Sequence, residues 1–292
     1  MIFDGTAEAK RIEEKLIASG RLLSKSLLIL QCDGEEKEST YVRLKREMGE
    51  RLGVIVKTQK LKNSKQLRNI LKSKEIGGFD GVLVQLPILG AGRDETEEIL
   101  TAIVAEKDVD GLNSASSFQS AVVRAVLRIL KVAGVEEGRR IGVVGAEGLV
   151  GRRLMRDLGG AGYSCLGFDL GDDLAGLLAC ETIVSATGVA NLIQPEMVRE
   201  GVVAIDLGYP KGEFDQRVAQ KADFFTPVPG GVGPLTVICL FENLTSCVTA
   251  QLPKKAVKRY DKIIDEIESG KMPTRAFTKK DNIGAIEKYL NS

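Results

Sequence analysis

The 292-residue chain contains no histidine, and this absence restricts its chemistry more than any other feature of its composition. Catalytic serine–histidine and cysteine–histidine arrangements are excluded, and so are the common zinc sites that contain histidine. Any proton transfer therefore falls to lysine, aspartate, glutamate, tyrosine or cysteine side chains. We expect no metal site.

The chain also lacks an excess of either charge. It carries 41 Lys and Arg against 40 Asp and Glu, which gives a formal net charge of +1. Proteins that bind nucleic acid usually show a basic patch or stripe, and no such excess is visible here. We therefore expect a small-molecule partner and no nucleic acid.

Long apolar runs and paired cysteines are scarce as well. We find no apolar run of membrane-spanning length, and the acids in the first segment, MIFDGTAEAKRIEEKL, do not fit a secretory signal peptide. The cysteines are scattered without a CxxC pair, which favours reduced thiols over disulfides or metal ligands. We predict a soluble, cytoplasmic protein with no membrane partner. The five cysteines are Cys32, Cys165, Cys180, Cys239 and Cys247.

The order of apolar and amphipathic segments predicts two α/β units that join near residues 112–120. In both units, helix-length connections separate apolar strands, which is typical of parallel sheets covered on both faces. The first unit has expected helices over 6–19, 40–52 and 64–73 and buried strands over 25–32 and 80–86. The second has expected helices over 120–133, from about 149 and over 235–247, and strands over 139–145, 163–169, 181–187 and 202–208. The charged end of the chain predicts a helix over 254–268 and a short final helix.

A glycine-rich turn follows the strand expected over 139–145. Gly145, Gly148 and Gly151 would let backbone N–H groups approach a pyrophosphate at the start of a helix, although a tight structural turn is the alternative. Asp169 ends the next strand, where a carboxylate commonly accepts hydrogen bonds from an adenosine ribose. A solvated strand end would also explain Asp169. The two features together favour a dinucleotide site.

Tyr41 and Lys45 are four residues apart on an expected helix, so their side chains share one face. A tyrosine can pack against a heteroaromatic ring, and a lysine can act as acid or base when burial lowers its pKa. Most pairs at this spacing are surface contacts, and that alternative stays open.

Three further polar residues are candidates for a ligand site. Gln85 lies among apolar neighbours at the end of an expected strand, where parallel sheets bind ligands, although it could simply bond to backbone. Asp108 and Asp110 share a short turn before Gly111, where capping of the turn is the usual role of an aspartate. The loop TPVPGGVGPLT over 226–236 is the most specific segment, because prolines fix its path and glycines permit backbone to approach a flat ligand.

Five segments in this order resemble the bifunctional methylenetetrahydrofolate dehydrogenase/methenyltetrahydrofolate cyclohydrolase family: YVRLK over 41–45, GVLVQLP over 81–87, KDVDG over 107–111, GAEGLVG over 145–151 and TPVPGGVGPLT over 226–236. The resemblance implies an α/β fold with two domains and a cleft between them. It implies a folate-binding catalytic domain over 1–119, completed by a C-terminal helix within 253–292, and a Rossmann-like nicotinamide-dinucleotide-binding domain with a doubly wound parallel sheet over 120–252. It also suggests a homodimer.

The resemblance implies oxidation of 5,10-methylenetetrahydrofolate with NAD or NADP, then hydrolysis of the methenyl product to 10-formyltetrahydrofolate. Lys45 would be the acid/base, Tyr41 would orient it and pack on the folate, Gln85 would tune it, and Asp110 would anchor the pterin. Further tetrahydrofolate contacts are expected at Leu86, Pro87, Pro229, Gly230 and Gly231. Cofactor contacts are expected at Gly145, Ala146, Glu147, Gly148, Gly151, Asp169, Thr187, Gly188 and Tyr209.

The chain departs from the family pattern at three places. Ala146 and Glu147 replace Arg and Ser of the phosphate turn, residues 120–123 replace a Pro-Cys-Thr-Pro stretch, and the segment between Asn113 and Phe118 is shortened. The carboxylates of Glu147 and Asp169 favour NAD over NADP, unless Arg152 or Arg153 neutralises them. A protein that keeps only one of the two activities, and a non-catalytic folate- or dinucleotide-binding protein, are the alternatives.

Overall fold

The computed structural model describes residues 1–34 and 38–250, so the helices expected within 253–292 lie outside the described residues. The described chain divides into two compact units. Unit 1 consists of Met1–Ala9 and Gln119–Cys239, and unit 2 consists of Lys10–Phe118 and residues 240–250. Both are α/β units with parallel sheets, as the sequence predicts.

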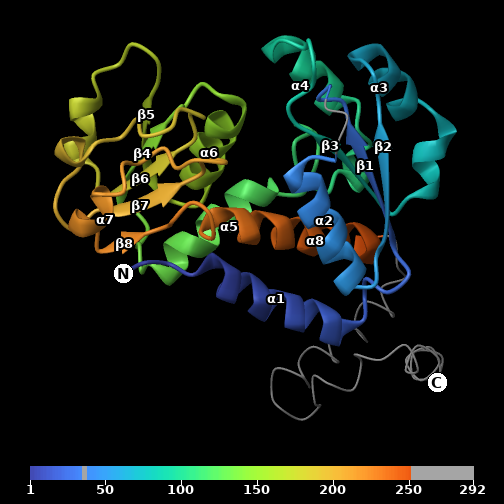
Figure 1. The fold of residues 1–292 in the computed structure, drawn as a ribbon, viewed down its shortest axis with the longest axis horizontal. Helices are drawn as coiled ribbons and strands as arrows, with labels where there is room; N and C mark the ends of the chain where they lie inside the picture. The colour runs from blue at the N-terminus through green and yellow to red at the C-terminus, as the bar shows by residue number, and fades with distance from the viewer. Residues whose placement is uncertain (35–37, 251–292) are drawn as a thin grey trace. The chain divides into compact units, whose positions relative to one another are not determined.

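Unit 2 contains a three-stranded parallel sheet with the order β2-β1-β3 (Figure 1). Its strands are β1 (Ser26–Gln31), β2 (Ile55–Lys60) and β3 (Gly81–Gln85). The central strand β1 is almost wholly buried, and its last residue pairs in register with Gln85. Because β2 is an edge strand whose residues are all at least partly exposed, it lacks the apolar run that identifies β1 and β3 from sequence.

Unit 2 also contains helices and short 3₁₀ turns. The helices are α1 (Gly5–Ser19), whose first residues belong to unit 1, α2 (Thr40–Arg51), α3 (Ser64–Leu71) and α4 (Arg93–Thr101). The 3₁₀ turns are η1 (Lys74–Gly78) and η2 (Ala105–Lys107). The start of α2 is capped by Ser39, whose side chain accepts the N–H of Val42 at 3.3 Å. Gly49 of α2 packs tightly, because a Cβ there would lie 2.4 Å from Val56 of β2.

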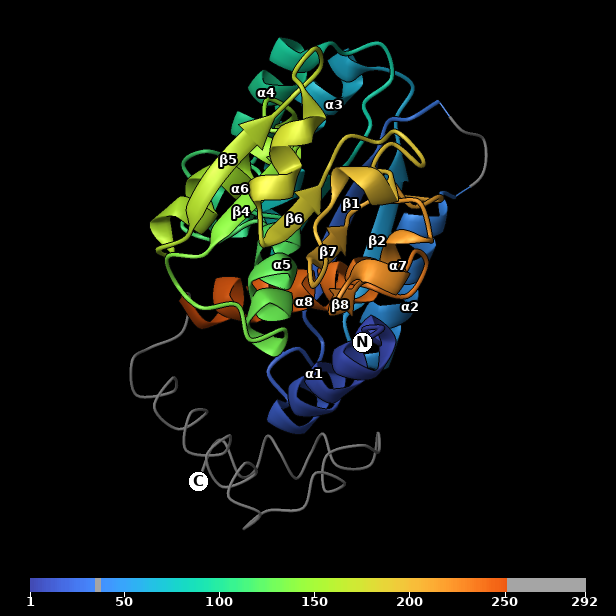
Figure 2. The same cartoon turned by 90° about the vertical axis from the view of Figure 1, so that its left-hand side faces the viewer.

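Unit 1 contains a five-stranded parallel sheet with the order β5-β4-β6-β7-β8. Its strands are β4 (Arg140–Val144), β5 (Ser164–Phe168), β6 (Thr182–Ser185), β7 (Val203–Asp206) and β8 (Phe224–Phe225). β4, β6 and β7 lie side by side in both views (Figure 1, Figure 2). After β4 the chain adds β5 on one side of β4 and then crosses over to add β6 on the other side. The direction in which strands are added therefore reverses at β4. In doubly wound sheets, ligands bind beyond the carboxyl ends of the strands at such a reversal.

The helical elements of unit 1 connect these strands. They are α5 (Ala121–Val132), α6 (Leu149–Gly160), α7 (Val218–Lys221) and the 3₁₀ turns η3 (Leu174–Ala179) and η4 (Pro195–Met197). A buried apolar cluster that includes Ile183, Phe214 and Phe225 forms much of the core.

The first residues of the chain extend unit 1 beside β8. Ile2 forms a parallel bridge with Phe225, the N–H of Phe3 donates to the carbonyl of Phe225 at 2.9 Å, and the rings of Phe3 and Phe224 lie 5.4 Å apart. Met1–Ala9 therefore group with residues 119–239, whereas the sequence places them in the domain over 1–119. The partners are more than 200 residues apart in sequence, so no local pattern indicates this pairing.

The last described helix, α8 (Val232–Ala250), contains the helix predicted over 235–247. By length and composition alone its window Val232–Thr249 is apolar enough to cross a membrane, which corrects the expectation that no apolar run is long enough. Of this window, 61% is buried inside the structure. A core helix has the same composition, because a helix that is apolar on all sides can be buried on all sides.

Candidate functional site

The first candidate site lies on unit 2, where α2 places Lys45 against the end of β3. Lys45 is only 5% exposed, and its Nζ donates a hydrogen bond to Oε1 of Gln85 at 2.9 Å. Burial lowers the pKa of Lys45 from its ordinary value, while the nearby charge of Asp110 opposes this shift. The arrangement creates a buried amine that is easier to deprotonate than a surface lysine.

Gln85 has a fixed orientation at the carboxyl end of β3. Its Nε2 donates to the carbonyl oxygen of Leu86 at 2.8 Å, which leaves its Oε1 to accept from Lys45. The sequence alternative, an ordinary bond from Gln85 to backbone, is therefore correct for one end of the amide only. The other end contacts the lysine.

The two aspartates of the short turn have different environments. Asp108 is fully buried, and its carboxylate accepts the N–H groups of Gly111 at 3.1 Å and of Asn113 at 2.7 Å. Burial raises the pKa of Asp108 to about 6 against the lowering effect of these bonds. Turn capping thus describes Asp108, whereas Asp110 is half-buried and acts electrostatically on Lys45.

Tyr41 precedes Lys45 by about one turn on α2, as the spacing predicts, and it is half-buried. Leu86 is half-buried and Pro87 is exposed, directly after β3. Unit 2 therefore joins the predicted residues Lys45 and Gln85 through a hydrogen bond. It also places Asp110 where its charge raises the pKa of Lys45.

The predicted folate contacts Pro229, Gly230 and Gly231 belong to unit 1. Gly230 has a positive φ of +100°, a conformation that favours glycine. A Cβ on Gly5, at the start of α1, would lie 1.8 Å from the carbonyl oxygen of Gly231, so that loop packs directly on the helix start. The sequence reasoning missed Gly5, because a single glycine at a helix start carries no specific signal.

The second candidate site is the turn between β4 and α6 on unit 1. Gly145 has a φ of +82°, and a Cβ on it would lie 2.6 Å from the carbonyl oxygen of Ala186. A Cβ on Gly151 would lie 1.9 Å from the carbonyl oxygen of Gly145, and one on Gly148 would lie 3.0 Å from the same atom. Only glycines allow this close packing of turn, helix and the loop after β6. The first N–H groups of α6 have no partner within the helix, which suits an anion such as a pyrophosphate.

Asp169 does more than end its strand. Its Oδ2 accepts the N–H of Glu147 at 2.6 Å, and its Oδ1 accepts the N–H of Leu170 at 2.8 Å. The carboxylate therefore ties the end of β5 to the turn before α6. Ala146 is 7% exposed and Glu147 is exposed.

Three other predicted cofactor contacts follow β6 and β7. The N–H groups of Thr187 and Gly188 donate to the carboxylate of Glu213 at 2.8 and 2.7 Å. Tyr209 is 45% exposed. Glu213, which is 2% exposed, was missed by sequence reasoning, because its segment PKGEFDQ has no apolar period and resembles a surface loop.

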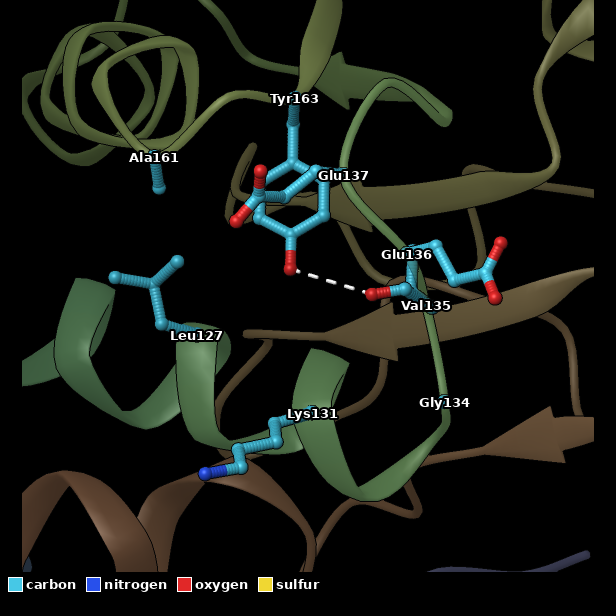
Figure 3. Close-up of a pocket in the computed structure, with 8 residues that line it drawn as sticks. All are labelled: Leu127, Lys131, Gly134, Val135, Glu136, Glu137, Ala161 and Tyr163. Carbon is cyan, nitrogen blue, oxygen red and sulfur yellow. Dashed lines mark hydrogen bonds between the residues drawn. The ribbon is translucent and has the colours of Figure 1, made fainter.

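A separate cavity of about 840 Å³ lies elsewhere on unit 1 (Figure 3). It is lined by Lys131 of α5, the loop over 134–137 and Tyr163, whose hydroxyl donates to the carbonyl of Val135 at 3.3 Å. This loop and Tyr163 precede β4 and β5, so the cavity is at the amino ends of the strands, away from the glycine turn. Among residues 1–34 and 38–250, no group of three or more Cys, Asp or Glu could hold a metal ion.

The fold and the glycine turn define a two-domain α/β protein with a Rossmann-like dinucleotide unit. Residues 3–110 match the sequence model of the tetrahydrofolate dehydrogenase/cyclohydrolase catalytic domain, and residues 120–252 match that of the NAD(P)-binding domain of the same family. The chain belongs to the tetrahydrofolate dehydrogenase/cyclohydrolase family, which confirms the resemblance carried by the five segments.

Individual relatives agree with this assignment. The chain is 32% identical over 244 residues to the bifunctional protein FolD of Mycoplasmopsis synoviae, a match that covers 75% of this chain and 87% of the relative. It is similar to the crystal structure of the bifunctional enzyme FolD from Campylobacter jejuni, with a TM-score of 0.77 and 27% identity over 86% of this chain and 99% of that one. The Trypanosoma brucei enzyme complexed with NADP and an inhibitor gives a TM-score of 0.76 at 25% identity, over 86% of this chain and 97% of that one.

Proposed function

We propose that this chain oxidises 5,10-methylenetetrahydrofolate with a nicotinamide dinucleotide and then hydrolyses the methenyl product to 10-formyltetrahydrofolate. The observation that carries the proposal is the buried Lys45, hydrogen-bonded to Gln85 and influenced by Asp110. In a chain without histidine, a lysine with a lowered pKa is the residue type best suited to move a proton near neutral pH.

In the hydrolytic step, the neutral amine of Lys45 accepts a proton from water while the water oxygen forms a bond to the methenyl carbon. The bond from this carbon to N5 then breaks, N5 takes up a proton and the added hydroxyl group loses one, which gives 10-formyltetrahydrofolate. The lysine returns its own proton to solvent, so that one proton is released overall. Gln85 accepts a hydrogen bond from Nζ and thereby fixes the direction of the amine. Asp110 raises the pKa of Lys45 and so counteracts part of the effect of burial.

Substrate contacts are assigned to the surroundings of this lysine. Tyr41 lies on the same face of α2 and packs on the folate ring, and Asp110 anchors the polar edge of the pterin. Leu86 and Pro87, which directly follow Gln85, supply apolar contacts. On unit 1, Pro229, Gly230 and Gly231 stay predicted folate contacts, because glycine permits backbone to approach a flat ligand.

The residues of unit 1 fit a nicotinamide dinucleotide. A Cβ at Gly145, Gly148 or Gly151 would fill the tight turn before α6, which is the arrangement that lets backbone approach a pyrophosphate. When bound, the dinucleotide would accept a hydride from the methylene carbon. The turn over 145–151 would hold its pyrophosphate, and the Asp169 carboxylate would face its adenosine ribose.

The same residues favour NAD over NADP. A 2′-phosphate needs cationic or neutral donors, whereas a ribose 2′-hydroxyl is well matched to a carboxylate such as Asp169. Of the two arginines that could neutralise the turn, Arg153 is buried and donates to the carbonyl of Leu149 at 2.7 Å, which leaves the exposed Arg152. Like-charge contacts in a partly desolvated site cost on the order of a few kcal/mol. A clear NADP preference in kcat/KM would contradict this assignment.

A cyclohydrolase without dehydrogenase activity is the second candidate. It is favoured by the hydrogen bond from the Glu147 N–H to Asp169, because that donor is then not free for a phosphate. Two assays separate the candidates: reduction of NAD or NADP by methylenetetrahydrofolate, and decay of methenyltetrahydrofolate without cofactor. Bifunctionality requires both signals, and the second candidate requires only the decay. A protein silent in both would be a binding protein.

Two broader features belong to the proposal. A homodimer is supported by β5, which is an edge strand of its sheet and exposes Leu166, and by the exposed Leu170 two residues after the end of β5. A cytoplasmic location is supported by the cysteines, all five of which are free thiols in the structure. Light scattering during size-exclusion chromatography tests the first, since a monomeric mass at micromolar concentration contradicts it.

A further inference from the structure

Glu213 is a buried carboxylate that collects the polar groups at the end of β6. It is 2% exposed and accepts hydrogen bonds from the Ser185 and Thr187 hydroxyls and from the N–H groups of Thr187 and Gly188. The three bonds from Thr187 and Gly188 measure 2.7 to 2.8 Å. One side chain therefore fixes both the backbone and the side chains of the segment that follows β6.

Glu213 is itself held by the end of β7. Asp206 accepts the N–H of Glu213 on both carboxylate oxygens, at 2.9 and 3.1 Å, and also the N–H groups of Gly208 at 2.8 Å and Phe214 at 3.2 Å. Asp206 is 2% exposed. The backbone on either side of Glu213 thus has little freedom, and the direction of its side chain is set.

The segment that Glu213 fixes is one wall of the glycine turn. The Cβ position of Gly145 lies 2.6 Å from the carbonyl oxygen of Ala186 and 3.2 Å from the nitrogen of Thr187. β4 and β6 are neighbouring strands at the point where the strand order reverses. The loop over 186–188 and the turn over 145–151 therefore meet at the site where such sheets bind their ligand.

We propose that Glu213 is a positioning residue for the dinucleotide, an inference that rests on the proposed function. It does not contact the cofactor. It holds the loop over 186–188 against the glycine turn, so that the site is formed before the cofactor arrives. The N–H groups of Thr187 and Gly188 point to Glu213, and their contribution to binding is made through the shape of the loop.

The role requires a carboxylate. An ionised carboxylate accepts at both oxygens, whereas the amide of a glutamine presents an NH₂ group in place of one of them. In Glu213→Gln that NH₂ group would face either the N–H of Gly188 or the N–H of Thr187. Two donors would then oppose each other, and part of the hydrogen-bond network would be lost. Glu213→Asp keeps the charge but is one methylene shorter.

The experiment compares Glu213→Gln with the wild type and with Glu196→Gln, the same substitution at an exposed position of η4. NADH fluorescence titration measures the cofactor Kd, and hydrogen exchange measures protection of the amides over 186–188 without cofactor. If the variant loop holds the competent conformation a tenth of the time, the apparent Kd rises about tenfold. For Glu213→Gln we expect loss of protection of the amides over 186–188. We expect unchanged hydrolysis of methenyltetrahydrofolate and an unchanged kcat at saturating cofactor.

The proposal is overturned if folded Glu213→Gln binds NADH within about twofold of the wild type and keeps amide protection over 186–188. An equal loss of cofactor affinity and of methenyltetrahydrofolate hydrolysis also overturns it, because the effect would then be a general loss of folding. If Glu213→Gln does not fold, Glu213→Asp takes its place with a smaller expected rise in Kd. A wild type that binds neither NADH nor NADPH contradicts the proposed function instead, and the exchange measurement still decides the role of Glu213.

Discussion

Replacing Gln85 with leucine should lower the pKa of Lys45 further. The Lys45 ammonium donates to Oε1 of Gln85 at 2.9 Å in a site where the lysine is 5% exposed, so little solvent is available to replace a lost acceptor. A hydrogen bond to a charged group contributes about 1.5–3 kcal/mol, and one pKa unit corresponds to about 1.4 kcal/mol. The pKa of Lys45 should therefore fall by about 1–2 units in Gln85→Leu, in the same direction as the effect of burial.

The pH dependence of methenyltetrahydrofolate hydrolysis measures this shift, after subtraction of the uncatalysed rate. The neutral amine is the base, so kcat should rise with pH through the pKa of Lys45, and this rise should occur about 1–2 units lower in the variant. Gln66→Leu is the matched control, because Gln66 is exposed on α3. A rise at the same or a higher pH in folded Gln85→Leu would refute the reasoning.

Three other variants test separate residues. Lys45→Met should abolish hydrolysis and should also raise Tm at neutral pH. The rise in Tm is expected because burial lowers the pKa of Lys45 in the folded state, so the charged lysine destabilises the fold below that pKa. This destabilisation disappears as pH rises to the ordinary pKa of lysine. A Tm of Lys45→Met below that of the wild type at neutral pH would contradict this direction of the stability change. Asp110→Ala should mainly raise the folate KM, and an unchanged KM would show that Asp110 does not anchor the folate. Asp108→Ala should lower Tm, because the Asp108 carboxylate accepts the buried N–H groups of its turn. Asp169→Ser should narrow the ratio of kcat/KM between NAD and NADP, and an unchanged ratio would mean that Asp169 does not select the cofactor.

The sequence predicts where Tyr41, Lys45 and Gln85 lie in the fold, because the signals that place them are local. The spacing of Tyr41 and Lys45 places both on one helix face, and Gln85 ends a strand that is apolar enough to be identified. The hydrogen bond between Lys45 and Gln85 joins residues 40 positions apart, and it follows from the resemblance to the family, not from either local pattern. The separate roles of Asp108 and Asp110 require the structure, because the two differ in burial, in the hydrogen bonds that Asp108 accepts and in the effect of Asp110 on Lys45.

What the sequence does not predict depends on long-range contacts. β2 is an exposed edge strand without an apolar run, and the pairing of Ile2 with Phe225 spans most of the chain. Glu213 lies in a polar segment and finds its partners 25 to 28 residues earlier. Buried carboxylates of this kind have no sequence signature, because their burial is created by the loops that they hold.

The most direct test of the whole account is the absorbance time course of the purified protein with methylenetetrahydrofolate and, in separate runs, NAD or NADP. The account predicts growth of the reduced-nicotinamide signal with little accumulation of the methenyl signal in the wild type, because Lys45 removes the methenyl product by hydrolysis. It predicts accumulation of the methenyl signal in any Lys45→Met protein that still reduces the cofactor. No reduced nicotinamide with either NAD or NADP, from protein that is folded, would contradict it.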